Sequence, residues 1–126
     1  MALGFYPGCS LKGSSREYNE SVLALAKAYG IELSEINDWN CCGATAAHNL
    51  NSELSLALPS RVLALAEKQG LTDVLVPCAA CYGRMSSTLH ELKEHSELRT
   101  KISDVIGMEL STSVRLINII QFIEKY

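Results

Sequence analysis

The five cysteines of the chain fall into three groups whose spacing suits a single metal or redox site. Cys9 stands alone, Cys41 and Cys42 are adjacent and followed by a glycine, and a C-x-x-C motif joins Cys78 to Cys81. An isolated cysteine is usually a small buried hydrophobe. An adjacent pair and a C-x-x-C motif within 126 residues instead indicate ligands or reactive thiols. We therefore take these five thiols as the candidate site.

Five thiols can hold an iron-sulfur cluster, hold zinc or exchange disulfides, and the residues alone leave all three chemistries open. Thiolates are the usual ligands of iron-sulfur clusters, and a helix N-terminus favours the thiolate form. Structural zinc takes four tetrahedral ligands, which five thiols with an adjacent pair exceed. Thioredoxin-like exchange would use Cys78 and Cys81 at a strand-to-helix turn, but it gives the other three cysteines no role.

Several other side chains near the cysteines are weaker candidates. His48 follows the cysteine pair and could support the ligands or deliver protons. His90 and His95 fall in an acid-rich stretch that is typical of a solvated helix face. Trp39, just before the pair, suits a packing lid. Three cations flank the cysteine segments and could steer an anionic substrate, namely Lys12, Arg16 and Arg84.

Composition indicates one mildly acidic domain. A chain of 126 residues with 48% hydrophobic content can bury one core, and it is too short for two domains of typical size. Its 11 Lys and Arg residues against 14 Asp and Glu residues give a net charge of −3. Such a charge provides no basic surface for a phosphate backbone, so nucleic acid is not an expected partner.

The sequence carries the signals of a cytoplasmic protein. Its first residues have no basic stretch followed by a long apolar run, so no secretion signal is expected. No segment has the length and hydropathy of a transmembrane span. An odd number of cysteines argues against a secreted disulfide scaffold, because the cytosol keeps structural thiols reduced.

Strands and helices alternate along the chain, and each cysteine group follows a strand. Strands are predicted at residues 2–6, 31–36 and 72–76. Helical periodicity is expected over residues 14–29, 52–69 and 78–92. Pro59 must either kink the second of these helices or start it afresh. After a charged stretch and a connector over residues 91–110, caps at 111–113 predict a last helix through 114–123.

This alternation predicts a small Rossmann-like α/β domain of three layers, with a short, mainly parallel sheet between helices and right-handed crossovers. In open α/β sheets, ligand sites form outside the carboxyl ends of the strands. Because each cysteine group follows a different strand, the topology is expected to bring all five thiols to one edge of the sheet.

Three motifs around the cysteines resemble the N-terminal CCG domain found in the B-type subunits of heterodisulfide reductase. They are Tyr6-Pro7-Gly8-Cys9-Ser10, Asp38-Trp39-Asn40-Cys41-Cys42-Gly43-Ala44 and Val76-Pro77-Cys78-Ala79-Ala80-Cys81-Tyr82. The likeness covers nearly the whole chain, including its closing segment from Val114. The CCG motif at this distance from an upstream cysteine and a downstream C-x-x-C is far more specific than C-x-x-C alone.

The resemblance implies an oxidoreductase that binds a noncubane [4Fe-4S] cluster, at which a disulfide is reduced by two electrons. In the family this disulfide joins coenzyme M and coenzyme B, or other thiols in non-methanogenic relatives. The implied cluster ligands are Cys9, Cys41, Cys42, Cys78 and Cys81. In air the cluster is expected to be lost, or replaced by zinc or by disulfides.

The resemblance also implies partners. The family's proteins carry two CCG domains in tandem, whereas residues 1–126 contain one, so we expect this chain to be the N-terminal half of such a protein and incomplete as an enzyme by itself. The expected partners are a second CCG domain, other heterodisulfide reductase-like subunits and a thiol or disulfide substrate. The surface that a second domain would cover could make the isolated domain a homodimer.

Overall fold

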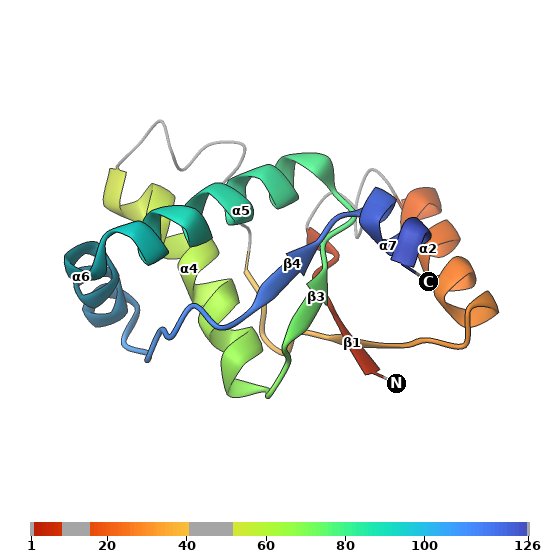
Figure 1. The fold of residues 1–126 in the computed structure, drawn as a ribbon, viewed down its shortest axis with the longest axis horizontal. Coiled ribbons are helices and arrows are strands. Elements are labelled where there is room, and N and C mark those ends of the chain that lie inside the picture. Colours follow the sequence, from red (N-terminus) through yellow and green to blue (C-terminus); the bar gives the residue numbers. More distant parts are fainter. Residues whose placement is uncertain (1, 9–15, 41–51, 126) are drawn as a thin grey trace.

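The computed structural model describes residues 2–8, 16–40 and 52–125. Within them, four short strands form one parallel sheet in the order β2-β1-β3-β4 (Figure 1). The strands are β1 (Ala2–Phe5), β2 (Glu32–Glu35), β3 (Asp73–Leu75) and β4 (Arg115–Ile117). The described helices are α2 (Arg16–Ala28), α4 (Ser52–Lys68), α5 (Ala79–Glu94), α6 (Ser96–Ile106) and α7 (Ile119–Lys125). The predicted parallel sheet is therefore confirmed.

Hydrophobic clusters on both faces of the sheet hold the three layers together. One cluster joins α2 and α7 to strand residues that include Leu75 and Ile117. The other joins α4, α5 and α6 to strand residues that include Val74 and Leu116. Neighbouring strand residues belong to different clusters because successive side chains of a strand point to opposite faces. Figure 1 shows the sheet between the two groups of helices, which confirms the predicted three-layer domain.

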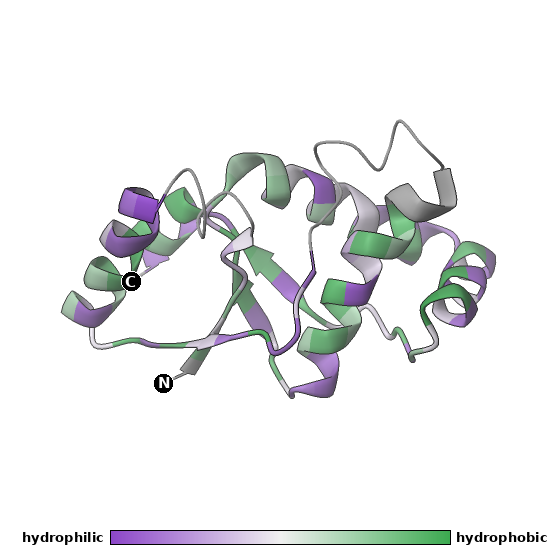
Figure 2. Ribbon diagram, turned by 180° about the vertical axis from the view of Figure 1, so that it is seen from behind, coloured by the Kyte–Doolittle hydropathy of each residue, from purple (hydrophilic) through white to green (hydrophobic). Residues whose placement is uncertain are grey.

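The helices cover the sheet through their apolar sides. In α2 the buried positions Asn19, Val22 and Ala26 recur at helical spacing, and exposed polar residues alternate with them. Figure 2 shows the same distribution by hydropathy, with hydrophobic residues along the central strands and many hydrophilic ones on the outer turns of the helices. Among the described residues, no helix has both the length and the apolar character that a membrane span requires.

The connections keep one hand. From β1 the chain moves through α2 to β2 at one edge, and from β2 it returns through α4, on the opposite face, to β3 beyond β1. The second crossover runs in the opposite direction across the sheet and on the opposite face, so it has the same handedness as the first, as expected for parallel units.

Close strand packing requires a glycine at position 4. Gly4 pairs with Val74 in the sheet. A Cβ at Gly4 would lie 2.9 Å from the carbonyl oxygen of Asp73 and 2.9 Å from Cγ2 of Val74. Any side chain there would push β1 away from β3, and these two strands border the cysteine segments.

The prediction of one helix through residues 114–123 is wrong. Residues Arg115–Ile117 form β4, and the helix that follows, α7, begins at Ile119. The apolar residues Val114, Ile117, Ile120 and Ile123 match a helical period, but only the first two are buried, at 1% and 5% exposure against 65% and 50% for the others. The true start of the helix is a reciprocal cap, in which the Gln121 backbone N–H donates to the Asn118 side chain (2.8 Å) and the Asn118 N–H to the Gln121 side chain (2.9 Å).

Two smaller points concern the middle of the chain. The fresh start offered for Pro59 does not occur, since α4 runs unbroken from Ser52 to Lys68 with Pro59 inside it, and the kink stays a prediction. Helix α6 begins at Ser96 inside the charged stretch and continues into the expected connector, and it ends at Gly107 in the left-handed conformation (φ 69°). His95 consequently lies at the junction of α5 and α6, outside the helix in which it was predicted.

Candidate metal centre

The carboxyl ends of β1, β2 and β3 meet at one edge of the sheet because the three strands are parallel neighbours. Cys9 follows the last residue of β1 by four positions, Cys41 that of β2 by six, and Cys78 that of β3 by three. Cys9, Cys41 and Cys42 lie outside the described residues, so their placement stays a prediction. Cys78 and Cys81 are described, and both lie at this edge.

The centre of this edge is the point where the strand connections diverge. The chain leaves β1 toward α2 on one face and leaves β3 toward α5 on the other face. In doubly wound sheets, this arrangement opens a crevice outside the carboxyl ends of the two strands, and ligands bind there. The segments that carry Cys9 and Cys78 begin on the two sides of this point.

Cys78 and Cys81 occupy the first turn of α5. Cys78 is the N-cap residue, with extended backbone angles (φ −69°, ψ 119°) and, among the described residues, no hydrogen bond from its side chain to the cap. Its half-buried thiol is free. Cys81 is 4% exposed. The N-terminus of a helix presents backbone N–H groups and a positive dipole end, which stabilise nearby anionic groups such as thiolate ligands.

The residue before Cys9 lies directly against the Cys81 sulfur. Gly8 has a positive φ of 74°. A Cβ on Gly8 would stand 3.0 Å from Sγ of Cys81 and 3.4 Å from the ring of Tyr6. Only a residue without a side chain therefore allows this approach without displacing the sulfur. The structure thus brings the start of the first cysteine segment to the third cysteine group.

Tyr18 links α2 to the turn that presents Cys78. Its hydroxyl donates a hydrogen bond to the carbonyl oxygen of Pro77 (3.1 Å). Partial burial, and then the nearby Cys78 thiol, raise the pKa of Tyr18 above its usual 10.0. The hydroxyl is therefore protonated at neutral pH and remains a hydrogen-bond donor beside the candidate ligand.

The segment that leads to Cys41 is anchored at the same edge by two aromatic residues. Tyr6, fully buried, donates its hydroxyl to the carbonyl oxygen of Asn40 (2.7 Å). Its ring meets Trp39 edge to face, with 5.4 Å between centroids and 77° between planes. Trp39 also donates Nε1–H to the Glu35 carboxylate (2.9 Å) and packs against the core, which fits its predicted role as a packing lid.

The remaining sequence candidates lie at exposed, half-buried or undescribed positions. Lys12 and His48 lie outside the described residues. His90 and His95 are exposed, as a solvated stretch predicts, and His95 approaches Glu91 at 3.8 Å. Arg16 is exposed at the start of α2, and Arg84 is half-buried in α5. The described ranges contain no group of three or more potential metal-ligating side chains, and they include only two of the five cysteines.

Four residues that sequence reasoning did not single out support the cysteine segments. Tyr6 and Asn40 lie inside the cysteine motifs, so their position beside the cysteines was a usable signal. Tyr18 and Arg61 lie in helices far along the chain from the residues that they contact, at separations of 59 and 23 positions. No local pattern marks them.

A family model described as the cysteine-rich domain, CCG, matches residues 3–86. The chain belongs to the CCG cysteine-rich domain family. This CCG domain is 39% identical over 88 residues to the 8-methylmenaquinol:fumarate reductase membrane anchor subunit of Wolinella succinogenes, which covers 70% of the chain and 31% of that relative. It is 26% identical over 107 residues to a heterodisulfide reductase B-like protein of Archaeoglobus profundus, covering 82% of the chain and 35% of the relative.

The fold of the CCG domain is shared with a solved structure. The crystal structure of a hypothetical protein from Helicobacter pylori superposes with a TM-score of 0.84 at 9% identity, over 99% of this chain and 25% of that protein. At this identity the likeness concerns the fold alone, and it agrees with the three-layer architecture. The CCG domain spans only about a third of the length of these two curated relatives, at 31% and 35%.

Proposed function

We propose that this CCG domain holds an iron-sulfur cluster and transfers electrons within a heterodisulfide reductase-like oxidoreductase, with a disulfide as the final acceptor. The observation that carries the proposal is the convergence at one edge of the sheet. Cys78 begins α5, the Cys81 sulfur lies against Gly8, and Tyr6 holds Asn40 beside them. Gly8 and Asn40 are the residues that immediately precede Cys9 and Cys41.

The donor set fits such a cluster. Five thiols exceed the four ligands of a structural zinc ion and match the preference of iron-sulfur clusters for thiolates. We propose Cys9, Cys41, Cys42, Cys78 and Cys81 as the ligands of a noncubane [4Fe-4S] cluster. When bound, this group supplies one-electron chemistry and an electrophilic metal that can accept a sulfur ligand.

The chain's own residues would perform three tasks around that centre. The first turn of α5 stabilises negative charge on the ligands through its backbone N–H groups. Tyr18 fixes the Pro77 peptide and keeps a protonated hydroxyl beside Cys78. The buried Tyr6 ring and the packed Trp39 side chain exclude water from the inner side of the site.

The assembly is part of the proposal. We propose that residues 1–126 are the N-terminal half of a protein with two CCG domains; the domain covers about a third of either relative, which leaves room in each for a second domain. Other reductase subunits would deliver the electrons, and the substrate would be a thiol-coenzyme disulfide such as that of coenzyme M with coenzyme B. The cytoplasmic location and the homodimer of the isolated domain remain predictions.

A second function is favoured by one comparison. The relative at 39% identity is named as the anchor subunit of a quinol:fumarate reductase, and the relative named for heterodisulfide reductase is 26% identical. The same centre would then pass electrons between a quinol and a fumarate-reducing subunit, with no disulfide bond broken. The two functions differ in the oxidant to which the reduced domain passes its electrons.

Anaerobic analysis separates these functions from the two chemistries that the sequence left open. We expect iron and sulfide in the reconstituted protein and a paramagnetic signal on oxidation or reduction. Stoichiometric zinc with no iron after anaerobic reconstitution would indicate a structural zinc module instead. Disulfide exchange activity that depends on Cys78 and Cys81 but not on Cys9 would indicate a thioredoxin-like domain.

The acceptor is tested by mixing the reduced protein with each oxidant. In the assembled complex, disulfide reductase function predicts reoxidation of the centre by a heterodisulfide. Reduction of the oxidised centre by a quinol and its reoxidation through the fumarate-reducing subunit, with no response to disulfides, would support the second function.

A further inference from the structure

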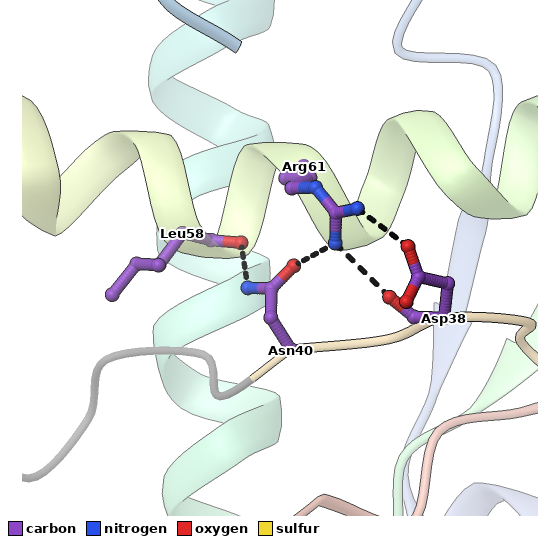
Figure 3. A network of polar contacts seen from close by, with 4 residues as sticks. All are labelled: Asp38, Asn40, Leu58 and Arg61. Atoms are coloured by element: carbon purple, nitrogen blue, oxygen red, sulfur yellow. Dashed lines mark hydrogen bonds and ion pairs between the residues drawn. The ribbon is translucent and has the colours of Figure 1, made fainter.

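A network of polar contacts ties the segment before Cys41 to helix α4. Figure 3 shows its four members, Asp38, Asn40, Leu58 and Arg61. Arg61 extends from α4, and its guanidinium reaches two residues of the segment that follows β2. None of these contacts belongs to the hydrophobic core or to the sheet. What they do is hold the segment of residues 38–40 against α4.

Arg61 makes three charge-assisted contacts in a forked geometry. Its Nη1 donates to the backbone carbonyl of Asp38 (3.0 Å) and to Oδ1 of Asn40 (2.8 Å). Its Nη2 donates to the Asp38 carboxylate (2.8 Å). Only a planar guanidinium can address these three acceptors together, because a lysine ammonium is a single point on a flexible stem.

Asn40 is held through three of its polar atoms. Its carbonyl oxygen accepts from the Tyr6 hydroxyl (2.7 Å), and its Oδ1 accepts from Arg61 (2.8 Å). Its Nδ2 donates to the carbonyl oxygen of Leu58 in α4 (2.9 Å). Both the backbone and the side chain of the residue before Cys41 are therefore fixed, one against the sheet edge and the other against α4.

Two further features indicate that this network fixes the position of the segment more than it stabilises the fold. Asp38 has a positive φ of 59°, a conformation that is uncommon for residues with a side chain although aspartate adopts it more readily than most, and Arg61 bonds both its carbonyl and its carboxylate. The Asp38 side chain is 82% exposed, and exposed ion pairs contribute little to stability. Hydrogen bonds from residues outside the ligand set are a common means of orienting metal ligands.

We infer that Arg61 is a positioning residue for the proposed metal centre. It acts through Asp38 and Asn40 to set the point at which the segment carrying Cys41 and Cys42 leaves the fold. This inference rests on the proposed function, since it assigns a role to Arg61 only if the two cysteines are ligands. Residues that orient metal ligands from outside typically change metal affinity by about 10–100-fold when they are replaced.

The test compares three variants by anaerobic titration with cobalt(II), whose bands with thiolate ligands report binding directly. Arg61→Lys keeps a positive charge near Asp38 but loses the fork, and Arg61→Gln loses both. Arg115→Gln is the matched control, because Arg115 also bonds a carboxylate, that of Asp73 (3.1 and 3.2 Å), but on β4, away from the cysteine segments.

We expect both Arg61 variants to bind cobalt(II) at least about 10-fold more weakly than the wild type, and the control to bind like the wild type. Arg61→Lys should unfold within a few degrees of the wild type, and its reconstituted iron centre should show a changed paramagnetic spectrum. A purely structural residue would alter the unfolding midpoint without altering the spectrum of the folded protein.

The outcomes separate the two claims. Wild-type protein that binds neither cobalt(II) nor iron would overturn the proposed function, and this inference with it. If both Arg61 variants bind cobalt(II) as tightly as the wild type, the inference about Arg61 is overturned and the proposed function is not. If Arg61→Gln does not fold, Arg61→Lys and Asn40→Ala decide the question, and unchanged affinity in both contradicts the positioning role.

Discussion

Replacing Tyr6 with phenylalanine removes one hydroxyl and leaves the aromatic packing in place. The hydroxyl donates to the Asn40 carbonyl (2.7 Å), and the ring, fully buried, contacts Trp39 edge to face. Because phenylalanine keeps this ring contact, the difference between the two proteins reports the hydrogen bond. Asn40 directly precedes Cys41, so the same bond connects the core of the fold to the candidate site.

The size of the effect follows from the burial of the two partners. A typical intramolecular hydrogen bond contributes about 0.5–1.5 kcal/mol net, and an acceptor left unsatisfied in the interior costs about 1–3 kcal/mol. Asn40 is half-buried, so water can partly replace the lost donor. The lower part of the range for an unsatisfied acceptor, about 1–3 kcal/mol, therefore applies. We expect a loss of about 1–1.5 kcal/mol, which for a domain of this size lowers the unfolding midpoint by roughly 4–6 °C.

The assay is thermal or urea unfolding of the reduced, metal-free protein, followed by fluorescence. Trp39 is the single tryptophan and lies against the Tyr6 ring, so its emission reports this region. Tyr29→Phe is the matched control, because Tyr29 also packs its ring against another aromatic residue, the buried Phe122, but is itself 36% exposed. If Tyr6→Phe unfolds at the same midpoint as the control, the hydrogen bond does not hold the segment as described.

Two further predictions address the sheet that carries the site. Gly4→Ala should destabilise the fold by about 1–3 kcal/mol, since the added Cβ would lie 2.9 Å from the Asp73 carbonyl, whereas Gly83→Ala in α5 should stabilise it by about 0.5–1 kcal/mol. A stable Gly4→Ala protein would contradict the close approach of β1 and β3. A hydrogen bond from Arg115, with the charges of Arg115 and Lys125, holds the pKa of Asp73 below its usual 3.8 despite partial burial. The unfolded chain therefore takes up a proton first as the pH falls below about 4, and the contribution of Asp73 to stability, fully present above that pH, is lost on further acidification. Asp73→Asn should flatten the pH dependence of the unfolding midpoint between about pH 5 and 3, and an unchanged slope would contradict this.

Most of the sheet could be predicted from the sequence because a strand-like segment precedes each cysteine group. Short strand-like segments before Cys9, Cys41 and Cys78 indicated β1, β2 and β3, and their alternation with helices indicated a parallel sheet. The fourth strand was missed because a residue pattern can satisfy two periods at once. Val114 and Ile117 are buried in the sheet region, while Ile120 shares their helical spacing without being buried.

The contacts that the supporting residues make could not have been predicted in this way. The Tyr6 hydroxyl meets a carbonyl 34 positions away, and Arg61 meets an amide 21 positions away. Which distant residues meet is decided by the packing of α4 against the sheet, and no local propensity encodes that choice. The cysteine motifs identified the candidate ligands. The hydrogen bonds that hold the segments carrying them are visible only in the folded structure.

The most direct test of the account is the iron content and paramagnetic spectrum of the wild type beside one serine variant from each cysteine group, Cys9→Ser, Cys41→Ser and Cys81→Ser. If the three segments converge on one centre, each variant should lose the wild-type signal and much of its iron, while the apoproteins keep the same secondary structure. A Cys9→Ser protein that retains full iron and an unchanged spectrum would show that the first segment does not contribute to the centre, and would contradict the convergence on which the proposed function rests.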